Sequence, residues 1–316
     1  MLYSPAPMHI PDGFLSTIIA LIYWALSLGV LAVALRKTRQ TLGEREAPLL
    51  GVLAATIFAG QMINFSVAGG TSGHLLGAAL ATILVGPFPA MLVMTAVLSI
   101  QALIFQDGGL LALGANVFNL AVIGPAVSYA VYVPIQRLAG GKPWGIFTGG
   151  FVAAWVSIVI AALSCALQLS LSGTSPAFIA VPAMGGIHAL IGIGEGLITT
   201  GALAFLYSAR RDLVRAAPEK PAGSRAVIVG GGMLALVMVV LSPLASAHPD
   251  GLEWVAEQFG FMERAQDAFI SIIPDYVMPG IPDKSLAVIM AGVIGLVMVF
   301  GVTWAAARSE KKTFNQ

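Results

Sequence analysis

Residues 14–35 read FLSTIIALIYWALSLGVLAVAL, and this stretch decides the fold. It is about 22 residues long and carries no charge, and about 20 apolar residues in a helix span the hydrocarbon core of a bilayer. No lysine or arginine precedes it, so it lacks the basic first region of a cleavable signal peptide. We therefore expect it to be retained as a first transmembrane helix.

The composition of the whole chain agrees with this interpretation. Of its 316 residues, 58% are hydrophobic and only 10% are charged, which indicates a multi-pass membrane protein in contact with membrane lipid. The net charge is +1 and no dense basic run occurs, so no nucleic-acid partner is expected. The single cysteine, Cys165, lies in an apolar stretch and is interpreted as a packing residue.

Further apolar runs of spanning or near-spanning length follow the first. The third is short and rich in glycine, and GPFP at 86–89 is interpreted as a turn that separates it from the fourth. The sequence thus predicts an all-α membrane protein with about nine transmembrane helices. The predicted spans are 14–35, 48–67, 75–86, 88–105, 115–136, 146–171, 181–207, 226–246 and 285–307.

The basic residues predict the orientation of these spans. With nine spans and the amino terminus outside, every lysine and arginine except Arg264 and Lys284 falls on the inner side. Inner loops of membrane proteins are enriched in these residues. The amino terminus is therefore predicted outside and the carboxyl terminus inside.

A polar segment divides the chain into two units. Residues 208–225, SARRDLVRAAPEKPAGSR, have the composition of a cytoplasmic linker, which we place at 216–225. The first unit, 8–215, then has seven helices, and the second, 226–316, is a two-helix hairpin. Its outer loop, 247–284, is long, and we expect this loop to gate or load a site.

Three segments with unusual polar or glycine-rich character fall on the predicted outer side. They are MHIPDGFLS at 8–16, GGTSGH at 69–74 and QDGGLLALGAN at 106–116. In the first of them, Pro11, Asp12 and Gly13 are typical turn residues, and Asp12 is expected to cap the first helix through the amide of residue 14 or 15. The turn gives no reason for His9.

His9 and His74 form a candidate metal pair. A histidine near a membrane interface is commonly just solvated or hydrogen-bonded, but two delivered to one face from different segments can share an ion. If Met8 were the first residue, its amine, the His9 amide nitrogen and the His9 ring could chelate one ion, and His74 would complete four nitrogens in a plane. Planar nitrogen ligation favours nickel(II) or copper(II) over hard ions such as magnesium.

The three outer segments resemble those of a known family, the nickel and cobalt substrate-binding components (CbiM/NikM type) of energy-coupling factor transporters. The resemblance covers about residues 8–215. It implies metal binding by Met8, His9 and His74 in a substrate-specific subunit of an ATP-driven importer. It also implies a transmembrane coupling (T) component and ABC-type ATPase subunits as partners, a bacterial cytoplasmic membrane as the location, and no organic cofactor.

The second unit, with HPDGLEWVAEQFG at 248–260, is similar to the PDGLE-type small subunit (NikN/CbiN-like) of the same transporters, here fused to the first unit. Fusions of this kind imply Ni²⁺ as the transported substrate. Two alternatives stay open at this stage. One is Co²⁺ uptake by the same type of transporter, and the other is a self-sufficient secondary metal transporter.

Residues 1–7, MLYSPAP, depart from the family pattern because they precede the expected start. If they stay attached, the Met8 nitrogen is an amide and cannot act as a terminal amine. We expect these residues to be a non-native or processed extension, with translation from Met8 as the favoured explanation.

Four amide side chains lie near the outer ends of the predicted helices. Hydrogen bonding between helices is the common role of such residues. Because a metal-bound imidazole needs its second nitrogen satisfied, they are also candidates for orienting His9 or His74. These residues are Asn64, Gln101, Asn116 and Asn119.

Two further patterns involve acidic residues and histidines. His188 and Glu195 lie seven residues apart on one helix face, which predicts a buried pair or a packing role, with ion passage as the alternative.

Asp250 and Glu253 have capping-box spacing, which predicts a short helix in the outer loop with an apolar side. His248 precedes that turn and is a weaker candidate for a second metal contact. The expected apolar side consists of Leu252, Val255 and Phe259.

The sequence contains no motif for catalysis. AGGKPWG at 139–145 lacks the leading glycine and the Ser or Thr of a phosphate-binding loop, and H-E-x-x-H does not occur. The chain is therefore expected to be a transporter subunit rather than an enzyme, with ATP hydrolysis in its partners.

Overall fold

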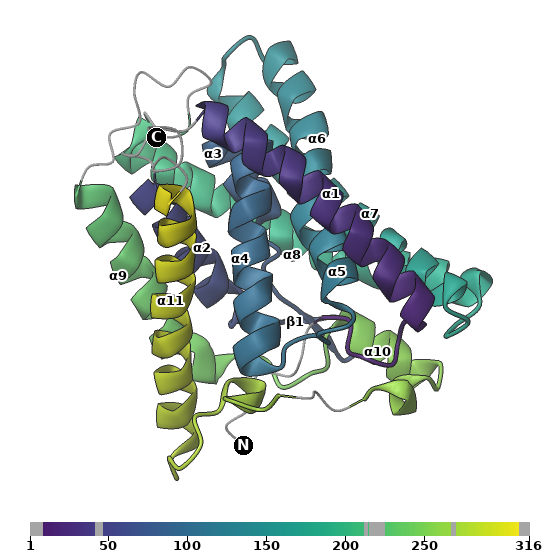
Figure 1. The fold of residues 1–316 in the computed structure, drawn as a ribbon. Helices are drawn as coiled ribbons and strands as arrows, with labels where there is room; N and C mark the ends of the chain where they lie inside the picture. The colour runs from purple at the N-terminus through teal and green to yellow at the C-terminus, as the bar shows by residue number, and fades with distance from the viewer. Residues whose placement is uncertain (1–8, 42–46, 212–213, 215–224, 267–269, 310–316) are drawn as a thin grey trace, which may run out of the picture.

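The computed structural model describes residues 9–41, 47–211, 214, 225–266 and 270–309. Most of the described chain is helical, and a long connection that contains α10 joins α9 to α11 (Figure 1). The helices are α1 (Thr17–Thr41), α2 (Ala47–Gln61), α3 (Ala78–Val85), α4 (Pro87–Phe105), α5 (Leu113–Asn116), α6 (Gly124–Leu138), α7 (Pro143–Leu171), α8 (Ala177–Ala209), α9 (Arg225–Leu241), α10 (Gly251–Gln258) and α11 (Lys284–Ser309).

Within the described residues, seven helical stretches are long and apolar enough to cross a membrane, which makes the chain a multi-pass membrane protein. The predicted spans at 48–67 and 75–86 appear as α2 and α3, with 15 and 8 residues. The count of nine spans and the orientation of the termini stay predictions.

A small β-hairpin replaces the end of the predicted second span. Strands β1 (Phe65–Val67) and β2 (Thr71–Gly73) pair antiparallel, with Phe65 opposite Gly73. Gly69 and Gly70 form the turn with φ values of 85° and 79°, which glycine adopts without a steric penalty. The hairpin directs the chain back toward the bundle, so that His74 follows directly after β2.

The turn predicted at 86–89 is present. Gly86 has φ 83° and ψ 168°, which no helix accommodates, and it both ends α3 and precedes α4. Pro87 begins α4, where its missing N–H costs nothing. α3 and α4 are therefore separate helices.

A π-helical segment, η1 (Val117–Ile123), joins α5 to α6. Such segments are rare and often occur at functional sites. Asn116 and Asn119 both lie in or next to this segment, and both are buried.

The second unit packs along one flank of the first. α9 and α11 stand beside α2 and α4, and the chain between them runs beneath the bundle to α10, near the start of α1 (Figure 1). Glycines permit this close packing, since a Cβ on Gly51 would lie 2.9 Å from the Phe300 ring and one on Gly295 would lie 2.2 Å from the Phe58 ring. We call the end of the bundle that carries residues 9–16, 65–77, 106–112, 247–266 and 270–283 the site end.

Candidate metal centre

The fold brings His9 and His74 together at the site end. Their ring centroids lie 5.8 Å apart, with the ring planes inclined at 59°. With metal–nitrogen bonds of about 2 Å, two imidazoles at this separation can share one ion. The third predicted ligand, Met8, lies outside the described residues.

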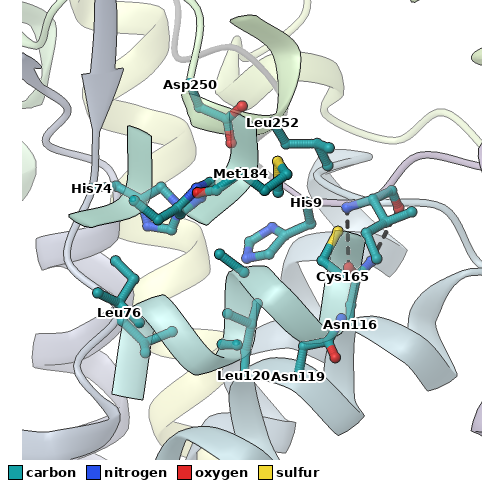
Figure 2. A pocket seen from close by; sticks show the side chains of 15 residues that line it. His9, His74, Leu76, Asn116, Asn119, Leu120, Cys165, Met184, Asp250 and Leu252 are labelled. Carbon is teal, nitrogen blue, oxygen red and sulfur yellow. Dashed lines mark hydrogen bonds between the residues drawn. The ribbon is translucent and has the colours of Figure 1, made fainter. Parts of the chain in front are cut away.

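The two histidines line a cavity of about 70 Å³, into which their rings project (Figure 2). That volume is sufficient for an ion with a few water molecules. The polar and sulfur-containing side chains around it come from both units of the chain. They are His9, His74, Asn116, Asn119, Cys165, Met184, His188 and Asp250.

A carboxylate fixes the ring of His9. Nδ1 of the His9 ring lies 2.7 Å from Oδ1 of Asp107, and both side chains are buried. This contact favours the tautomer with hydrogen on Nδ1, which leaves the lone pair on Nε2. Nε2 is buried and has no hydrogen-bond partner among the described residues, so it is the ring nitrogen available to an ion.

This arrangement bears on the fused chelate predicted for Met8 and His9. A ring nitrogen that shares an ion with its own residue's amide nitrogen must be Nδ1, because Nε2 points away from the backbone. In the structure Nδ1 faces Asp107. The fused chelate therefore requires the ring to turn so that Nε2 takes the contact with Asp107.

His74 is kept neutral by its surroundings. Burial, followed by the nearby His9, lowers the pKa of His74 from 6.5 to about 4. Its Nδ1 lies 3.1 Å from the carbonyl oxygen of Leu75. Because only a neutral imidazole ligates a metal, His74 is ready to bind at neutral pH.

Asn116 holds the backbone beside His9. The amide N–H of Ile10 donates to Asn116 Oδ1, and Asn116 Nδ2 donates to the Ile10 carbonyl, both at 3.0 Å. Gly109 N also donates to that carbonyl at 2.9 Å. Of the four predicted orienting amides, Asn116 thus fixes the position of His9 through the main chain.

The prediction that Asp12 caps the first helix is wrong. Its carboxylate oxygens accept from the backbone amides of Leu110 and Ala112, at 3.0 and 2.9 Å. The reason is that α1 begins only at Thr17, so the Pro-Asp-Gly turn faces the 106–116 segment instead. Asp12 ties the two segments that flank His9.

Gly108 and Gly109 make the close approach of these segments possible. A Cβ on Gly108 would lie 2.9 Å from the Cβ of His9, and one on Gly109 would lie 2.1 Å from Oδ1 of Asp12. Neither distance is tolerable, so a side chain at either position would displace the opening segment.

Glu195 and His188 are buried or partly buried as expected, but they do not pair with each other. The Glu195 carboxylate accepts from the amides of Leu76 and Gly77, at 2.7 and 3.0 Å. His188 Nδ1 instead lies 2.8 Å from the Met184 carbonyl oxygen. Glu195 therefore fixes the backbone of Leu76 and Gly77, which lies between His74 and the start of α3.

Of the other three predicted orienting amides, two form hydrogen bonds elsewhere and the Asn64 side chain forms none among the described residues. Asn119 bonds Gln168 and Ser164, and Gln101 donates to Gln61 at 2.9 Å. Both side-chain amide atoms of Asn64 are buried without a hydrogen bond among the described residues. That these three orient His9 or His74 stays a prediction.

The loop between α9 and α11 lies against the hairpin that precedes His74. Ser72 Oγ donates to the His248 carbonyl and Ser72 N to the Pro249 carbonyl, both at 2.8 Å. Trp254 Nε1 donates to the Gly69 carbonyl at 3.1 Å. The tip of the β-hairpin is thus attached to the start of α10.

The predicted helix in this loop is confirmed as α10. Asp250 Oδ1 accepts from Glu253 N at 2.7 Å, and the reciprocal capping-box bond is present. Leu252 and Val255 are buried as expected, while Phe259 is 47% exposed. A Cβ on Gly251 would lie 2.8 Å from the His188 ring, so the start of α10 covers that side of the cavity.

Two residues of the site were missed by the sequence prediction. Asp107 contacts His9, and Tyr276 in the outer loop donates its hydroxyl to Asp107 Oδ2 at 2.6 Å. Asp107 lies within QDGGLLALGAN, and it could have been found as the acidic residue of that segment. Nothing in the local sequence marks Tyr276.

The described residues contain no group of three or more His, Cys, Asp and Glu side chains that could hold an ion. An ion at His9 and His74 therefore needs further ligands of another kind, such as backbone nitrogen, a terminal amine or water. Imidazole nitrogen, a ligand that suits nickel, copper and zinc, is the donor that His9 and His74 offer to the cavity.

Comparisons with known proteins match two parts of the chain to two family models. Residues 9–213 match the family model CbiM, described as the cobalt uptake substrate-specific transmembrane region, and residues 225–312 match the PDGLE domain. A protein of Archaeoglobus fulgidus is 38% identical over 312 residues, which covers 95% of this chain and 98% of that protein. The fused nickel transport protein NikMN of Rhodobacter capsulatus is 30% identical, with 92% and 95% covered.

A solved structure is also similar. The crystal structure of a truncated transition metal transporter is 34% identical in sequence, with a TM-score of 0.58, and the match covers 64% of this chain and 99% of that one. These findings confirm the resemblance read from the three motifs and from HPDGLEWVAEQFG. The chain belongs to the CbiM family of substrate-specific transmembrane regions and carries a PDGLE domain after that region.

Proposed function

We propose that the chain is the substrate-specific, metal-binding membrane subunit of an ATP-driven energy-coupling factor importer. In this proposal it captures Ni²⁺ at the outer face for uptake. His9 and His74 supply imidazole nitrogens, and in a chain that starts at Met8 the terminal amine supplies another.

The observation that carries the proposal is the approach of His9 and His74, 5.8 Å apart, at one cavity. Histidine nitrogens are common ligands of nickel, copper and zinc, and a buried imidazole nitrogen without a partner is costly unless something binds it. The Nε2 of His9 is such an atom among the described residues. A metal ion satisfies it.

The choice of nickel rests on ligand chemistry and on the fused architecture. Nitrogen-rich ligation suits nickel(II), and the Rhodobacter capsulatus relative, 95% of which the match covers, is named a fused nickel transport protein. Cobalt is the alternative, because the matching family model is described by cobalt uptake. Competition between the two ions at one purified protein distinguishes them.

The energy for uptake is assigned to partner subunits. The sequence has no phosphate-binding loop, so an ABC-type ATPase and a transmembrane coupling component are proposed to act with it. The basic residues at the end of α1, after α6 and at the end of α8 lie at the end of the bundle opposite to the site end. This distribution supports a site end that faces away from the cytoplasm, in a bacterial cytoplasmic membrane.

A self-sufficient secondary transporter receives less support. Such a transporter needs a charged group within the membrane that an ion can reach, and Glu195 was the clear candidate. Both oxygens of its carboxylate are occupied by backbone amides. Uptake that persists in cells without the ATPase would nevertheless establish this alternative and overturn the ATP-driven assignment.

The first test is a metal analysis of the protein purified from its native host, together with its intact mass and amino-terminal sequence. About one nickel per chain that starts at Met8 is the expected result. His74→Ala should abolish binding, whereas His248→Ala, which changes an exposed histidine at the same end, should not. Equal nickel content in all three proteins would refute the site.

A further inference from the structure

A residue of the PDGLE unit reaches the metal-binding histidine of the first unit. Tyr276 belongs to the outer loop between α9 and α11, yet its side chain is fully buried. Its hydroxyl lies 2.6 Å from Oδ2 of Asp107, and Oδ1 of the same carboxylate lies 2.7 Å from Nδ1 of His9. Three buried side chains therefore form a continuous hydrogen-bonded chain from the second unit to the site.

The Tyr276 hydroxyl can only donate in this contact. Burial, followed by the negative charge of Asp107, raises the pKa of Tyr276 well above its ordinary value of 10. The neutral phenol gives its hydrogen to the carboxylate, and the carboxylate accepts from both sides. Asp107 is thereby contacted by His9 at Oδ1 and by Tyr276 at Oδ2.

The surrounding packing shows that this position is specific. The Tyr276 ring stacks on Phe105 at 4.6 Å with an interplanar angle of 8°. The loop is also joined to the end of α4, because Ile273 N donates to the Ile104 carbonyl at 3.0 Å and Gln106 Nε2 donates to the Ile270 carbonyl at 2.5 Å.

Backbone conformations with positive φ, which strain residues other than glycine, occur at the same contact. The described residues contain only three non-glycine residues with positive φ, at 60°, 52° and 57°. They are Gln106, which directly precedes Asp107, and Asp275 and Tyr276, which follow one another in the loop. Such strain persists only where the surrounding structure enforces it.

We propose that Tyr276 is a positioning residue for metal capture, which acts through Asp107 to fix the ring of His9 as a ligand. This inference rests on the proposed function, since it names how the second unit takes part in binding at the same site. The partner of a ligating histidine sets its tautomer and orientation. Docking of the outer loop and readiness of the metal site are therefore one event.

The test uses the full chain and Ni²⁺ as the probe. Tyr276→Phe keeps the ring stack on Phe105 and removes only the hydroxyl. Since the loss of an outer partner of a metal ligand weakens metal affinity roughly 10- to 100-fold, Asp107→Asn should reach that range and Tyr276→Phe should lower affinity roughly 3- to 10-fold. The absorption band of bound Ni²⁺ should shift in both variants, which a purely structural role would not cause.

Arg264→Met is the matched control. It removes one hydrogen bond between the same loop and the first unit, to the Gly173 carbonyl between α7 and α8, and leaves Tyr276 and Asp107 unchanged. Its nickel affinity and spectrum should equal those of the parent. If Arg264→Met weakens binding as much as Tyr276→Phe does, general docking of the loop explains the effect and the proposal is overturned.

The double variant tests whether Tyr276 acts through Asp107. If it does, adding Tyr276→Phe to Asp107→Asn causes little further loss, because the two effects are not additive. Multiplicative losses, or a Tyr276→Phe protein with unchanged affinity and spectrum, overturn the inference. Failure of the proposed function looks different, since the parent protein itself would then bind no nickel or would bind it without His74.

Discussion

At the scale of single residues, carboxylates do much of the positioning around the cavity. Asp12 and Glu195 each accept two backbone N–H groups from a segment distant in sequence, and Asp107 contacts two side chains. Hydrogen bonds to an ionised acceptor are among the stronger ones in proteins. The acidic residues therefore hold the histidines in place, while the histidines are left to face the ion.

Replacement of Glu195 tests this division of roles. In Glu195→Gln one oxygen becomes an NH₂ group, which cannot accept from Leu76 or Gly77, and a buried donor left without its acceptor costs about 1 to 3 kcal/mol. We expect a lower unfolding temperature and weaker nickel binding, because these amides follow directly after the His74 segment. Thermal unfolding in detergent and a nickel titration measure the two effects.

The exposed Glu257 provides the control for that experiment. Glu257→Gln makes the same chemical change on the surface of α10 and should alter neither quantity. An unfolding temperature for Glu195→Gln that equals the one for Glu257→Gln would show that the Glu195 contacts contribute nothing.

The sequence predicts one half of this residue network. His9 and His74 follow from their placement near turns and glycines on one predicted side of the membrane. Asp107 is marked only as the acidic residue of its segment and Tyr276 is not marked at all, since their roles depend on contacts between residues 98 and 169 positions apart. The role of Asp12 was misjudged for the same reason, because a local cap was available and the distant amides of Leu110 and Ala112 were not visible.

At the scale of elements, the apolar pattern predicts helices well and predicts their ends poorly. The helices α1, α4, α7, α8, α9 and α11 all coincide with predicted spans. The β-hairpin at 65–73 was not predicted, since FSV continues the apolar run of α2 and only the glycines at 69 and 70 signal a turn. Tertiary contacts, among them that of Ser72 with the outer loop, settle its conformation.

The capping box of α10 supports a prediction at this scale. Asp250→Ala removes the acceptor for the Glu253 amide, and loss of a cap costs about 1 kcal/mol of helix stability. Because the start of α10 covers the cavity beside His188, faster hydrogen exchange in residues 251–258 should accompany faster release of bound nickel.

Asp283 is the matched site, since its Oδ1 accepts from Leu286 N at 2.8 Å at the start of α11. Asp283→Ala should increase exchange only there and leave nickel release unchanged. Nickel release that responds equally to both substitutions would contradict a specific covering role for α10.

The docking of α10 should also depend on pH. Burial raises the pKa of Glu253 from 4.5 to about 7, so the folded loop favours the protonated form. A raised acid pKa makes the folded state progressively less stable as pH rises from about 4.5 to 7, with no further loss above that range. Burial raises the pKa of Asp250 as well, which acts in the same direction.

Hydrogen exchange of residues 251–258 measures this effect, after correction for the intrinsic pH dependence of exchange. Protection should be greater at pH 5 than at pH 8 in the metal-free protein, and Glu253→Gln should reduce the difference. Protection that increases toward pH 8 would contradict the prediction that docking of α10 becomes less stable as pH rises.

At the scale of the whole molecule, the second unit contacts the first through the helices α9 and α11 as well as through the loop between them. Gly51 and Gly295 bring α2 and α11 into close contact through the rings of Phe300 and Phe58, and Gly295 also lies against Phe105 of α4. Small residues at such interfaces permit the van der Waals packing that drives association of helices in membranes.

Substitutions of two glycines in α11 test the importance of this interface. Gly295→Leu introduces a side chain whose Cβ alone would lie 2.2 Å from the Phe58 ring. A Cβ added at Gly301 would have no neighbouring atom within 4 Å. After cleavage at a protease site inserted among residues 216–224, the two pieces of the parent and of Gly301→Leu should stay together and keep their nickel affinity. The pieces of Gly295→Leu should separate, and co-purification of all three would refute this role of the interface.

The fusion of the two units has a consequence for kinetics and competition. The outer loop with Tyr276 is tethered to the cavity that it contacts, and tethered neighbours experience effective concentrations in about the millimolar range. A loop that leaves the site end therefore returns to its own chain before a free molecule can replace it. A synthetic peptide of residues 247–284, or a separately made PDGLE unit, should be unable to displace it at micromolar levels, and the occupancy of the site does not depend on how much of a second protein the cell makes.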